Sequence, residues 1–283
     1  MPERLSSAFS LHHPENPASP HPDVREGVPM GNRWVREIKK LADGERQDLG
    51  AGLPPIPSLE VVYLTDPEAL AAVLPPPLTP PAEPRVHVRI TDIDLTFGEY
   101  RHKELVGFLA VDAVYDGFTG EYPLLIPIDL ESAISVSRER NGEPKKLADI
   151  ELIRAGDHVE GRITRNGVTF VEIVGDVAGP LPVGEPYPAA QWWYKFMPAV
   201  SGSGFDGDPL LVRYDQVRTP VTAESVEGKL VLRDEPTAPI VDLPVRETAS
   251  IAWTTRSSKG KASVVGPVDP VAFEPFAYSR YDH

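Results

Sequence analysis

The chain has 283 residues, of which 41% are hydrophobic and 25% charged, a composition typical of a soluble globular protein with a substantial core. Its formal net charge of −14 argues against a nucleic-acid partner, since nucleic-acid binding requires clusters of Lys and Arg. The absence of cysteine excludes disulfides, thiolate metal sites and a thiol nucleophile, and it fits a cytoplasmic location. No apolar leader follows Met1 and no run of about 18 apolar residues occurs, so we expect no signal peptide and no membrane span.

The beginning of the chain differs in composition from the rest. We predict an N-terminal extension over residues 1–50, partly disordered or clasping a neighbouring subunit, and one folded domain over residues 51–283. Within the extension, residues 32–49 have apolar side chains at helical spacing and predict a short helix. Three histidines lie where nothing orders them, and we interpret them as solvated side chains rather than metal ligands: His12, His13 and His21.

The folded domain begins with a strand and a helix. Residues 59–64 form an apolar, β-branched run that predicts a strand. Asp66 and Pro67 are typical of a helix start, as N-cap and first-turn residue, and predict a helix that continues to Leu74. The proline-rich run 75–81 ends that helix, and we interpret it as a rigid connector rather than a ligand of an SH3 domain.

From Arg85 onward the pattern is mainly that of β-strands. A short helix over residues 131–140, ended by Asn141-Gly142, interrupts this pattern. The expected strands cover residues 86–90, 106–115, 122–128, 151–153, 158–164, 168–174, 210–217, 226–233 and 245–253. We therefore predict a mainly β (α+β) fold, a strongly curved or closed antiparallel sheet or barrel with two or three short helices.

Two aromatic segments stand out near the end of the chain. Residues 192–198 form the densest aromatic cluster, which we interpret as core or subunit interface rather than a ligand-stacking surface. Residues after 255 include Gly, Pro and charged residues, and we predict that they form a C-terminal tail. That tail ends in aromatic side chains that we expect to clamp a surface or a neighbour: Phe273, Phe276, Tyr278 and Tyr281.

The stretch after the second helix is the one most indicative of chemistry. A Gly-x-Pro-Lys-Lys-Leu turn that follows a short helix resembles the signature of the acetoacetate decarboxylase superfamily, and the resemblance covers most of residues 59–254. The segments that carry it are, in chain order, residues 62–70 with the proline-leucine ending 75–78, Gly120-Glu121-Tyr122, Arg138-Glu139, Pro144-Lys145-Lys146-Leu147, Tyr194-Lys195-Phe196-Met197-Pro198 and 238–247.

The resemblance implies a catalytic domain in which Lys145 forms a Schiff base with a small keto acid, without a cofactor, in a homo-oligomer. A lysine amine of ordinary pKa, about 10.4, is protonated at pH 7, and acetoacetate decarboxylase is itself the standard example of a lysine activated by desolvation or a nearby cation. Pro144 favours an extended backbone before it, and neighbours in extended segments point to opposite faces. We therefore expect Lys146 to point away from Lys145 and to be secondary to a dry, apolar pocket around Lys145.

The same alternation places Glu143 on the side of Lys145. A carboxylate there opposes activation of the amine, because it stabilises the protonated form. Two interpretations stay open: Glu143 turns toward solvent, or it is a proton donor for a different reaction.

Four further residues are candidates for the site by resemblance. The family's Tyr-x-Glu acid reads Tyr100-Arg101-His102 here, so either His102 or Glu104 takes that position. Arg89 stands where the family has a glutamate and can hold a carboxylate, whereas an early family arginine falls on Ile56. Glu247 ends the family's P-x-x-D-L-P-V-x-E element. The alternative is that Arg89 and Glu104 are strand residues on a solvent-exposed face and that Glu247 stabilises a turn.

Three functions follow from this pattern. The first is a Schiff-base-forming lyase that decarboxylates a small β-keto acid through an iminium and an enamine. The second keeps the same lysine but performs aldol or dehydration chemistry on a pyruvate-like keto acid. The third is a non-catalytic binding module with the same fold.

Overall fold

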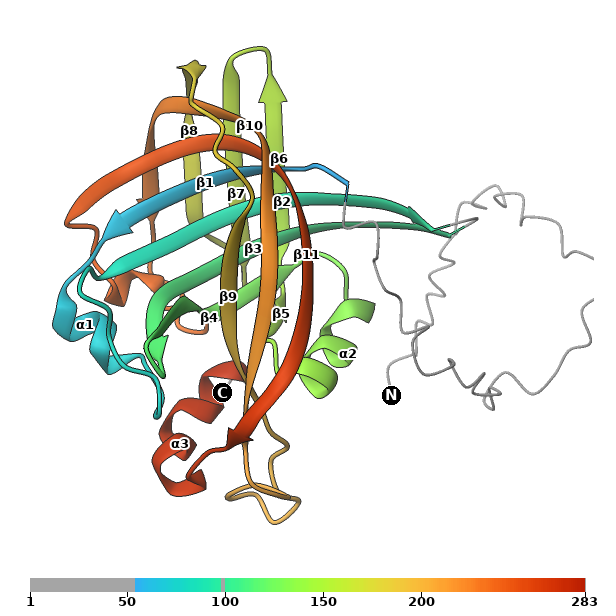
Figure 1. The fold of residues 1–283 in the computed structure, drawn as a ribbon, viewed down its shortest axis with the longest axis vertical. Coiled ribbons are helices and arrows are strands. Elements are labelled where there is room, and N and C mark those ends of the chain that lie inside the picture. Colours follow the sequence, from blue (N-terminus) through green and yellow to red (C-terminus); the bar gives the residue numbers. More distant parts are fainter. Residues whose placement is uncertain (1–53, 98–99, 283) are drawn as a thin grey trace, which may run out of the picture. The chain divides into compact units, whose positions relative to one another are not determined.

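The computed structural model describes residues 54–97 and 100–282, and among these it leaves the side chains of residues 95–102 undescribed. The predicted N-terminal extension, with its helix and histidines, lies outside the described residues. Across the described residues, eleven strands form one largely antiparallel sheet (Figure 1). The strands are β1 Ile56–Leu64, β2 Arg85–Phe97, β3 Tyr100–Tyr115, β4 Phe118–Ile128, β5 Lys145–Leu147, β6 Asp149–Ala155, β7 His158–Arg165, β8 Val168–Pro180, β9 Tyr187–Lys195, β10 Leu210–Leu232 and β11 Glu247–Pro267.

Most of the sheet closes on itself. Strands β11, β1, β2, β3, β4, β9 and β10 follow one another, and an additional pairing between β10 and β11 completes a ring. Strands β8, β7 and β6 continue from β10 as a meander, and β5 pairs in parallel with β4. Asn166 and Gly167 join β7 to β8 with positive φ angles of 49° and 78°, the conformation of the predicted tight turn. The prediction of a strongly curved or closed sheet is confirmed.

The last two strands of the ring are longer than the sequence indicated. Strand β10 pairs with β9 through its first half and with β8 through its second, so the two predicted strands 210–217 and 226–233 are one. Strand β11 runs to Pro267, so the expectation of a tail beginning at residue 255 is wrong. Its polar end is held by backbone pairing to β10, with register shifts near Pro220 that let the long strands bend.

Three α-helices occur in the part of the chain that is described: α1 Pro67–Ala72, α2 Ser132–Asn141 and α3 Pro270–Ala277. Helix α1 begins at Pro67 as predicted, but Asp66 makes no side-chain cap because its carboxylate accepts two hydrogen bonds from Arg246. Helix α3 was not predicted. Asp269 caps it, and Phe273 stacks on Tyr194 with ring centroids 4.7 Å apart. The aromatic tail is thereby tied to the core of its own domain. None of the described helices is long and apolar enough to cross a membrane.

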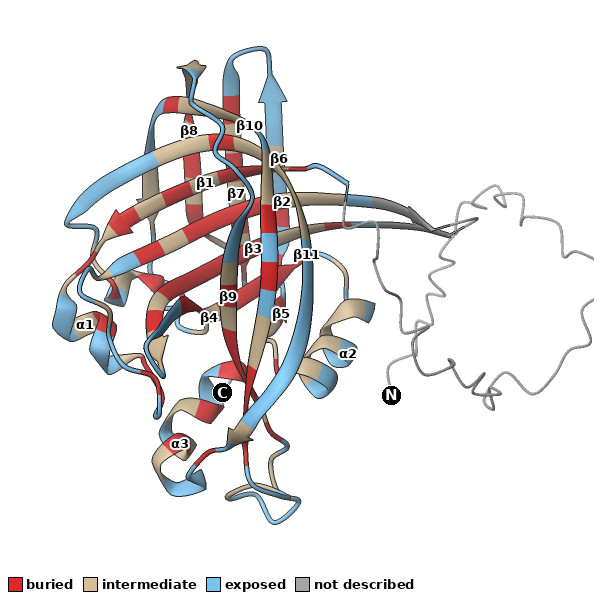
Figure 2. Ribbon diagram, in the orientation of Figure 1, coloured by how far each residue is buried: buried red, intermediate tan, exposed pale blue. Residues whose placement is uncertain are grey.

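The main apolar core lies on the outer face of the ring, where β6 and β7 contact β1, β2 and β3 (Figure 2). A Cβ on Gly161 of β7 would lie 2.8 Å from Ile90 Cδ1, so a larger residue there would require the Ile90 side chain to shift. Trp192, Tyr194 and Phe196 belong to this core, which confirms the core interpretation for these three residues of the aromatic cluster, whereas Trp193 stacks on Tyr214 of the inner face. The inner face of the ring carries only a small apolar cluster, and most of its buried side chains are polar or charged.

Candidate active site

Strand β5 directs the two adjacent lysines to opposite faces. Helix α2 ends at Gly142, which has φ 85°, and a Cβ there would lie 2.4 Å from Tyr194 O. The chain then enters β5, where Lys145 pairs with Ile126 and Lys146 with Pro127. Ile126 packs on Phe108 of the inner-face cluster, so Lys145 points into the ring and Lys146 away from it. The predicted separation of the two ammonium groups is found.

The ammonium of Lys145 has a carboxylate partner. Its Nζ lies 3.3 Å from Oε2 of Glu143, and the two side chains are only 11% and 14% exposed. Asn141 donates a hydrogen bond of 2.7 Å to the other Glu143 oxygen and holds the carboxylate in place. The interpretation in which Glu143 turns toward solvent is therefore wrong. Lys145 is largely buried, as predicted. The prediction of apolar surroundings is wrong at the ammonium group, because a carboxylate lies beside it.

Tyr214 of β10 interacts electrostatically with both the Glu143 carboxylate of this ion pair and the Arg218 guanidinium. Burial raises the pKa of the Tyr214 phenol, the neighbouring Glu143 carboxylate raises it further, and Arg218 acts in the opposite direction. The phenol therefore lies within electrostatic range of both Glu143 and Arg218. The ring of Trp193 stacks on Tyr214 with centroids 5.0 Å apart, which fixes the orientation of the phenol.

Glu121 of β4 is the centre of a buried ionic network. Arg218 binds it with two hydrogen bonds of 2.8 and 2.5 Å, and Arg89 donates a third of 3.1 Å. Gln191 adds a contact of 3.4 Å. Burial alone would raise the pKa of Glu121, but Arg89 and Arg218 hold it well below its usual value. Glu121 is therefore ionised and fully engaged with the protein.

The network continues to Glu60 of β1. Arg89 Nε lies 3.3 Å from Glu60 Oε1, Thr254 donates a hydrogen bond of 2.8 Å, and Arg256 of β11 contacts the same oxygen. Burial and the nearby Arg89 guanidinium lower the pKa of Arg256. Three guanidinium groups thus face two carboxylates in this network, which leaves one positive charge in excess.

Two buried donors on the same inner face have no partner among the described residues. They are the indole Nε1 of Trp193 and the amide Nε2 of Gln216. Gln216 lies two residues after Tyr214 in β10 and so shares its face. A buried donor without a partner costs about 1–3 kcal/mol, so an acceptor supplied by a ligand is favoured here. Together with the excess charge, these donors suit an anionic, oxygen-rich ligand.

The remaining predicted residues are placed as follows. Lys146 is buried on the outer face, where burial lowers its pKa. Glu104 is buried in β3 opposite Ile93, and the side chain of His102 is not described, so the choice between these two for the acid position stays a prediction. Arg89 lies inside the ring but is engaged by two carboxylates. Glu247 is exposed at the first position of β11, opposite Leu64, and the structure does not bring it together with Lys145.

Several residues of the site were missed by sequence reasoning. For Tyr214, Gln216 and Arg218 the sequence signal was their period-two spacing, but this segment was predicted only as a strand over residues 210–217. Glu121 was part of a segment that carries the resemblance but was given no role. Trp193 had been interpreted as core or subunit interface. The missed residues are Glu60, Glu121, Tyr214, Gln216, Arg218 and Arg256. No group of three or more His, Cys, Asp or Glu suited to a metal ion occurs in the described ranges.

Comparison with known proteins places the chain in a family. The model of the family described as acetoacetate decarboxylase (ADC) matches residues 52–266. An acetoacetate decarboxylase of Streptomyces nogalater is 32% identical over 220 residues, which cover 73% of this chain and 85% of that protein. The chain therefore belongs to the acetoacetate decarboxylase family.

Solved structures agree on the fold. A structure of acetoacetate decarboxylase is similar with a TM-score of 0.65 at 24% identity, covering 75% of this chain and 88% of that one. The enduracididine biosynthesis enzyme MppR, complexed with the condensation product of pyruvate and imidazole 4-carboxaldehyde, is similar with a TM-score of 0.63 at 15% identity. That comparison covers 76% of this chain and 90% of MppR. The same fold thus occurs in proteins with different chemistry.

Proposed function

We propose that the protein is a Schiff-base-forming lyase in which Lys145 attacks the ketone of a small β-keto acid and releases carbon dioxide. The observation that supports this most directly is the Lys145 ammonium, almost buried on the inner face of the ring and 3.3 Å from the Glu143 carboxylate. A nucleophile within reach of a proton acceptor is the arrangement that covalent catalysis by an amine requires.

The steps follow from these two groups. Glu143 accepts a proton from Lys145, and the free amine adds to the ketone carbon to give a carbinolamine, which loses water to become an iminium. The carbon–carbon bond to the substrate carboxylate then breaks and carbon dioxide leaves. The electron pair of that bond moves toward the iminium nitrogen, and the product is an enamine. A proton returns to carbon, from the Glu143 carboxyl or the nearby Tyr214 phenol. Hydrolysis of the second iminium frees the ketone product and the lysine.

The arginine network supplies the substrate's counter-charge. Arg89 contacts two glutamates and Arg218 donates two hydrogen bonds to Glu121. Arg256 contacts a single oxygen of Glu60, which it shares with Arg89, so the substrate carboxylate binds at Arg256. The unpaired donors of Trp193 and Gln216 are available to oxygen atoms of the same substrate. Arg256 thus takes the role that the sequence suggested for Arg89. We retain Glu104 or His102 as an additional acid.

A second function is favoured by Glu143 itself. A carboxylate beside the lysine can move protons at carbon atoms of the bound substrate, which aldol addition and dehydration require. MppR, which has this fold, was captured with a condensation product of pyruvate. In this alternative Lys145 forms the same iminium with a pyruvate-like keto acid, and no carbon dioxide is released.

Borohydride trapping separates these functions from a non-catalytic binding module. The protein is incubated with acetoacetate or with pyruvate, reduced with borohydride and digested, and the adduct is located by mass spectrometry. We expect an adduct on Lys145 that is lost in Lys145→Ala, with Lys261→Ala, at an exposed site on β11, as the control. Release of carbon dioxide identifies the lyase, and adduct formation without it identifies the aldol-type function. Absence of any adduct with a folded protein favours the binding module.

Assembly is a separate proposal. We propose a homo-oligomer, as the family resemblance implies, and light scattering on the full chain measures its mass. A monomeric mass contradicts this proposal without affecting the chemistry of Lys145.

A further inference from the structure

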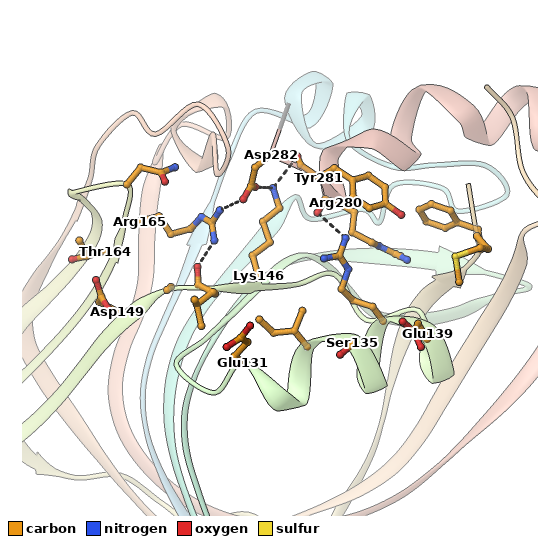
Figure 3. Close-up of a pocket in the computed structure, with 17 residues that line it drawn as sticks. Glu131, Ser135, Glu139, Lys146, Asp149, Thr164, Arg165, Arg280, Tyr281 and Asp282 are labelled. Atoms are coloured by element: carbon orange, nitrogen blue, oxygen red, sulfur yellow. Dashed lines mark hydrogen bonds and ion pairs between the residues drawn. The ribbon is translucent and has the colours of Figure 1, made fainter. Parts of the chain in front are cut away.

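A cavity of about 840 Å³ lies on the outer face of β5, where Lys146 but not Lys145 lines it (Figure 3). Helix α2, the turn between β7 and β8 and the segment 280–282 surround it. Lys146 and Arg165 extend from the strands into this region and meet at Asp282 (Figure 3). None of these groups takes part in the chemistry proposed for Lys145.

Lys146 and Arg165 are two almost completely buried cations that lie side by side at this cavity, and the buried Arg280 lines it as well. The side chain of Lys146 is 3% exposed and that of Arg165 is 5% exposed. Lys146 donates hydrogen bonds to the backbone oxygens of Thr237 and Tyr281, at 2.9 and 3.4 Å, and Arg165 donates to Leu147 O and Thr237 Oγ1. These neutral acceptors orient the two cations but do not neutralise them. Two buried positive charges side by side require counter-charges.

One of the counter-charges is a permanent part of the fold. Glu235 is buried, accepts hydrogen bonds from Asn166 and Thr237 of 2.9 and 2.7 Å, and lies 4.0 Å from Arg165. It balances one of the two cations. Because Glu235 is held by two neutral donors as well, it cannot leave without disturbing the turn between β7 and β8.

The other counter-charge comes from a side chain that is 52% exposed. Asp282 Oδ1 lies 3.0 Å from Lys146 Nζ, and Asp282 Oδ2 lies 2.8 Å from Arg165 Nη2. Asp282 follows the last 3₁₀ turn, Tyr278–Arg280, and is not itself part of a helix or strand. A carboxylate that bridges two buried cations while remaining half exposed occupies the position of an exchangeable ligand.

We propose that this cavity is a binding site for a small molecule with one carboxylate and an apolar body, whose carboxylate replaces that of Asp282 between Lys146 and Arg165. The volume suits such a ligand, since small-molecule sites are commonly about 300–1,000 Å³. Apolar walls are provided by Ile134, Phe196 and Met197.

The exposed rim of the cavity is acidic, which favours a ligand with a single anionic group. Glu131, Glu139 and Asp149 line the cavity and are exposed. Figure 3 places Glu131 and Glu139 on the helix side and Asp149 on the strand side. A second anionic group at this rim would meet these carboxylates, and like charges repel. Arg138 and Arg280 also line the cavity, but both donate hydrogen bonds to backbone oxygens of the protein. A monocarboxylate with an apolar body satisfies both the buried cations and the acidic rim.

The first test measures benzoate binding by calorimetry to the full chain and to Asp282→Ala. We expect removal of the internal carboxylate to tighten benzoate binding about tenfold or more, because a tethered competitor acts at an effective concentration in the millimolar range. Asp208→Ala, which removes an exposed aspartate elsewhere, is the control for net charge and should leave affinity unchanged. Asp282→Asn repeats the measurement with the side-chain shape retained. Equal affinity of the wild type and both Asp282 variants overturns the proposal.

The second test locates the bound benzoate, because the arginine network inside the ring also attracts anions. Ser135 is an exposed residue of α2 that lines the cavity, so Ser135→Trp fills it without disturbing a core. In the Asp282→Ala background we expect Ser135→Trp to abolish the gain in affinity. Val136→Trp, at the next exposed position of the same helix, should keep it. A gain that survives Ser135→Trp places the benzoate elsewhere and contradicts the proposal.

Discussion

The ammonium of Lys145 and the carboxylate of Glu143 lie 3.3 Å apart, on the same side of the chain and separated by Pro144 alone. The αL residue Gly142 ends α2 just before them, so the helix end, the proline and the short strand β5 together set their distance. Lys146, the immediate neighbour of Lys145, contacts Asp282 on the opposite face instead. Neighbouring residues of one short stretch therefore form ion pairs on opposite faces of the sheet.

The first prediction concerns Glu143 as a proton acceptor. Glu143→Gln should lower the rate of borohydride-trappable adduct formation about 10²-fold or more, because a positioned general base contributes about 10²–10⁴-fold. The glutamine amide has the same size as the carboxylate and its oxygen can still accept the hydrogen bond from Asn141, so the fold should persist. Glu139→Gln, at an exposed position on α2, is the matched control. A trapping rate in Glu143→Gln that equals or exceeds the wild type excludes a role for this carboxylate in activating Lys145.

The second prediction concerns the substrate carboxylate. Arg256→Met should raise KM for the keto acid about 10- to 100-fold with a much smaller change in kcat, since a hydrogen bond to a charged group contributes about 1.5–3 kcal/mol. Glu60 keeps Arg89 and Thr254 as partners in this variant, so the network should hold. Steady-state kinetics give both constants.

Two comparison variants sharpen that measurement. Arg256→Lys keeps the charge and should recover part of the affinity. Arg246→Met removes an exposed arginine paired with Asp66 and should leave KM unchanged. If KM in Arg256→Met stays at the wild-type value, the substrate carboxylate binds at another cation.

The sequence predicted the elements that local patterns define. The strand over 59–64, the helix ended by Asn141-Gly142 and the turn at Asn166-Gly167 each follow from residues adjacent in the chain, and all three are found. The opposite directions of Lys145 and Lys146 were predictable for the same reason, because alternation in an extended segment is a local rule.

The rest of the site depends on pairing between distant strands. Arg218, Glu121 and Arg256 come from β10, β4 and β11, and nothing in their sequence surroundings states that ring closure brings them together. The continuation of β11 past residue 255 escaped prediction because its Gly, Ser and Lys residues have low strand propensity. Their strand conformation comes from pairing with β10.

The third prediction tests the backbone that positions Lys145. Gly142→Ala should destabilise the protein by about 1–3 kcal/mol or more, because φ of 85° strains a residue with a Cβ and that Cβ would lie 2.4 Å from Tyr194 O. Gly156→Ala is the matched control. It also has a positive φ, of 66°, but its Cβ meets nothing within 4 Å, so only the conformational cost remains. Urea unfolding of both variants compares them, and equal losses of stability argue against a close contact at Gly142.

The fourth prediction concerns stability at low pH. Burial raises the pKa values of Glu60 and Glu121, but the neighbouring arginines more than offset this and hold both below the ordinary 4.5. A carboxyl whose pKa is depressed by folding stabilises the protein above its unfolded pKa, and that stability is lost as pH falls toward the folded value. The free energy of unfolding should therefore fall as pH drops below about 4.5, with a slope of about 1.4 kcal/mol per pH unit for each proton taken up.

A paired substitution isolates the contribution of Glu121 to that slope. Glu121→Gln alone leaves Arg218 buried without its carboxylate, which costs about 3–5 kcal/mol, so the informative variant is Glu121→Gln with Arg218→Met. Urea midpoints between pH 3 and pH 7 should fall less steeply in this double variant than in the wild type. Glu185→Gln, at an exposed position between β8 and β9, is the control and should keep the wild-type slope. If the pH dependence of the urea midpoint is the same in the double variant and the wild type, Glu121 takes up no proton on unfolding. That result contradicts the prediction that the arginines lower the pKa of Glu121 in the folded protein.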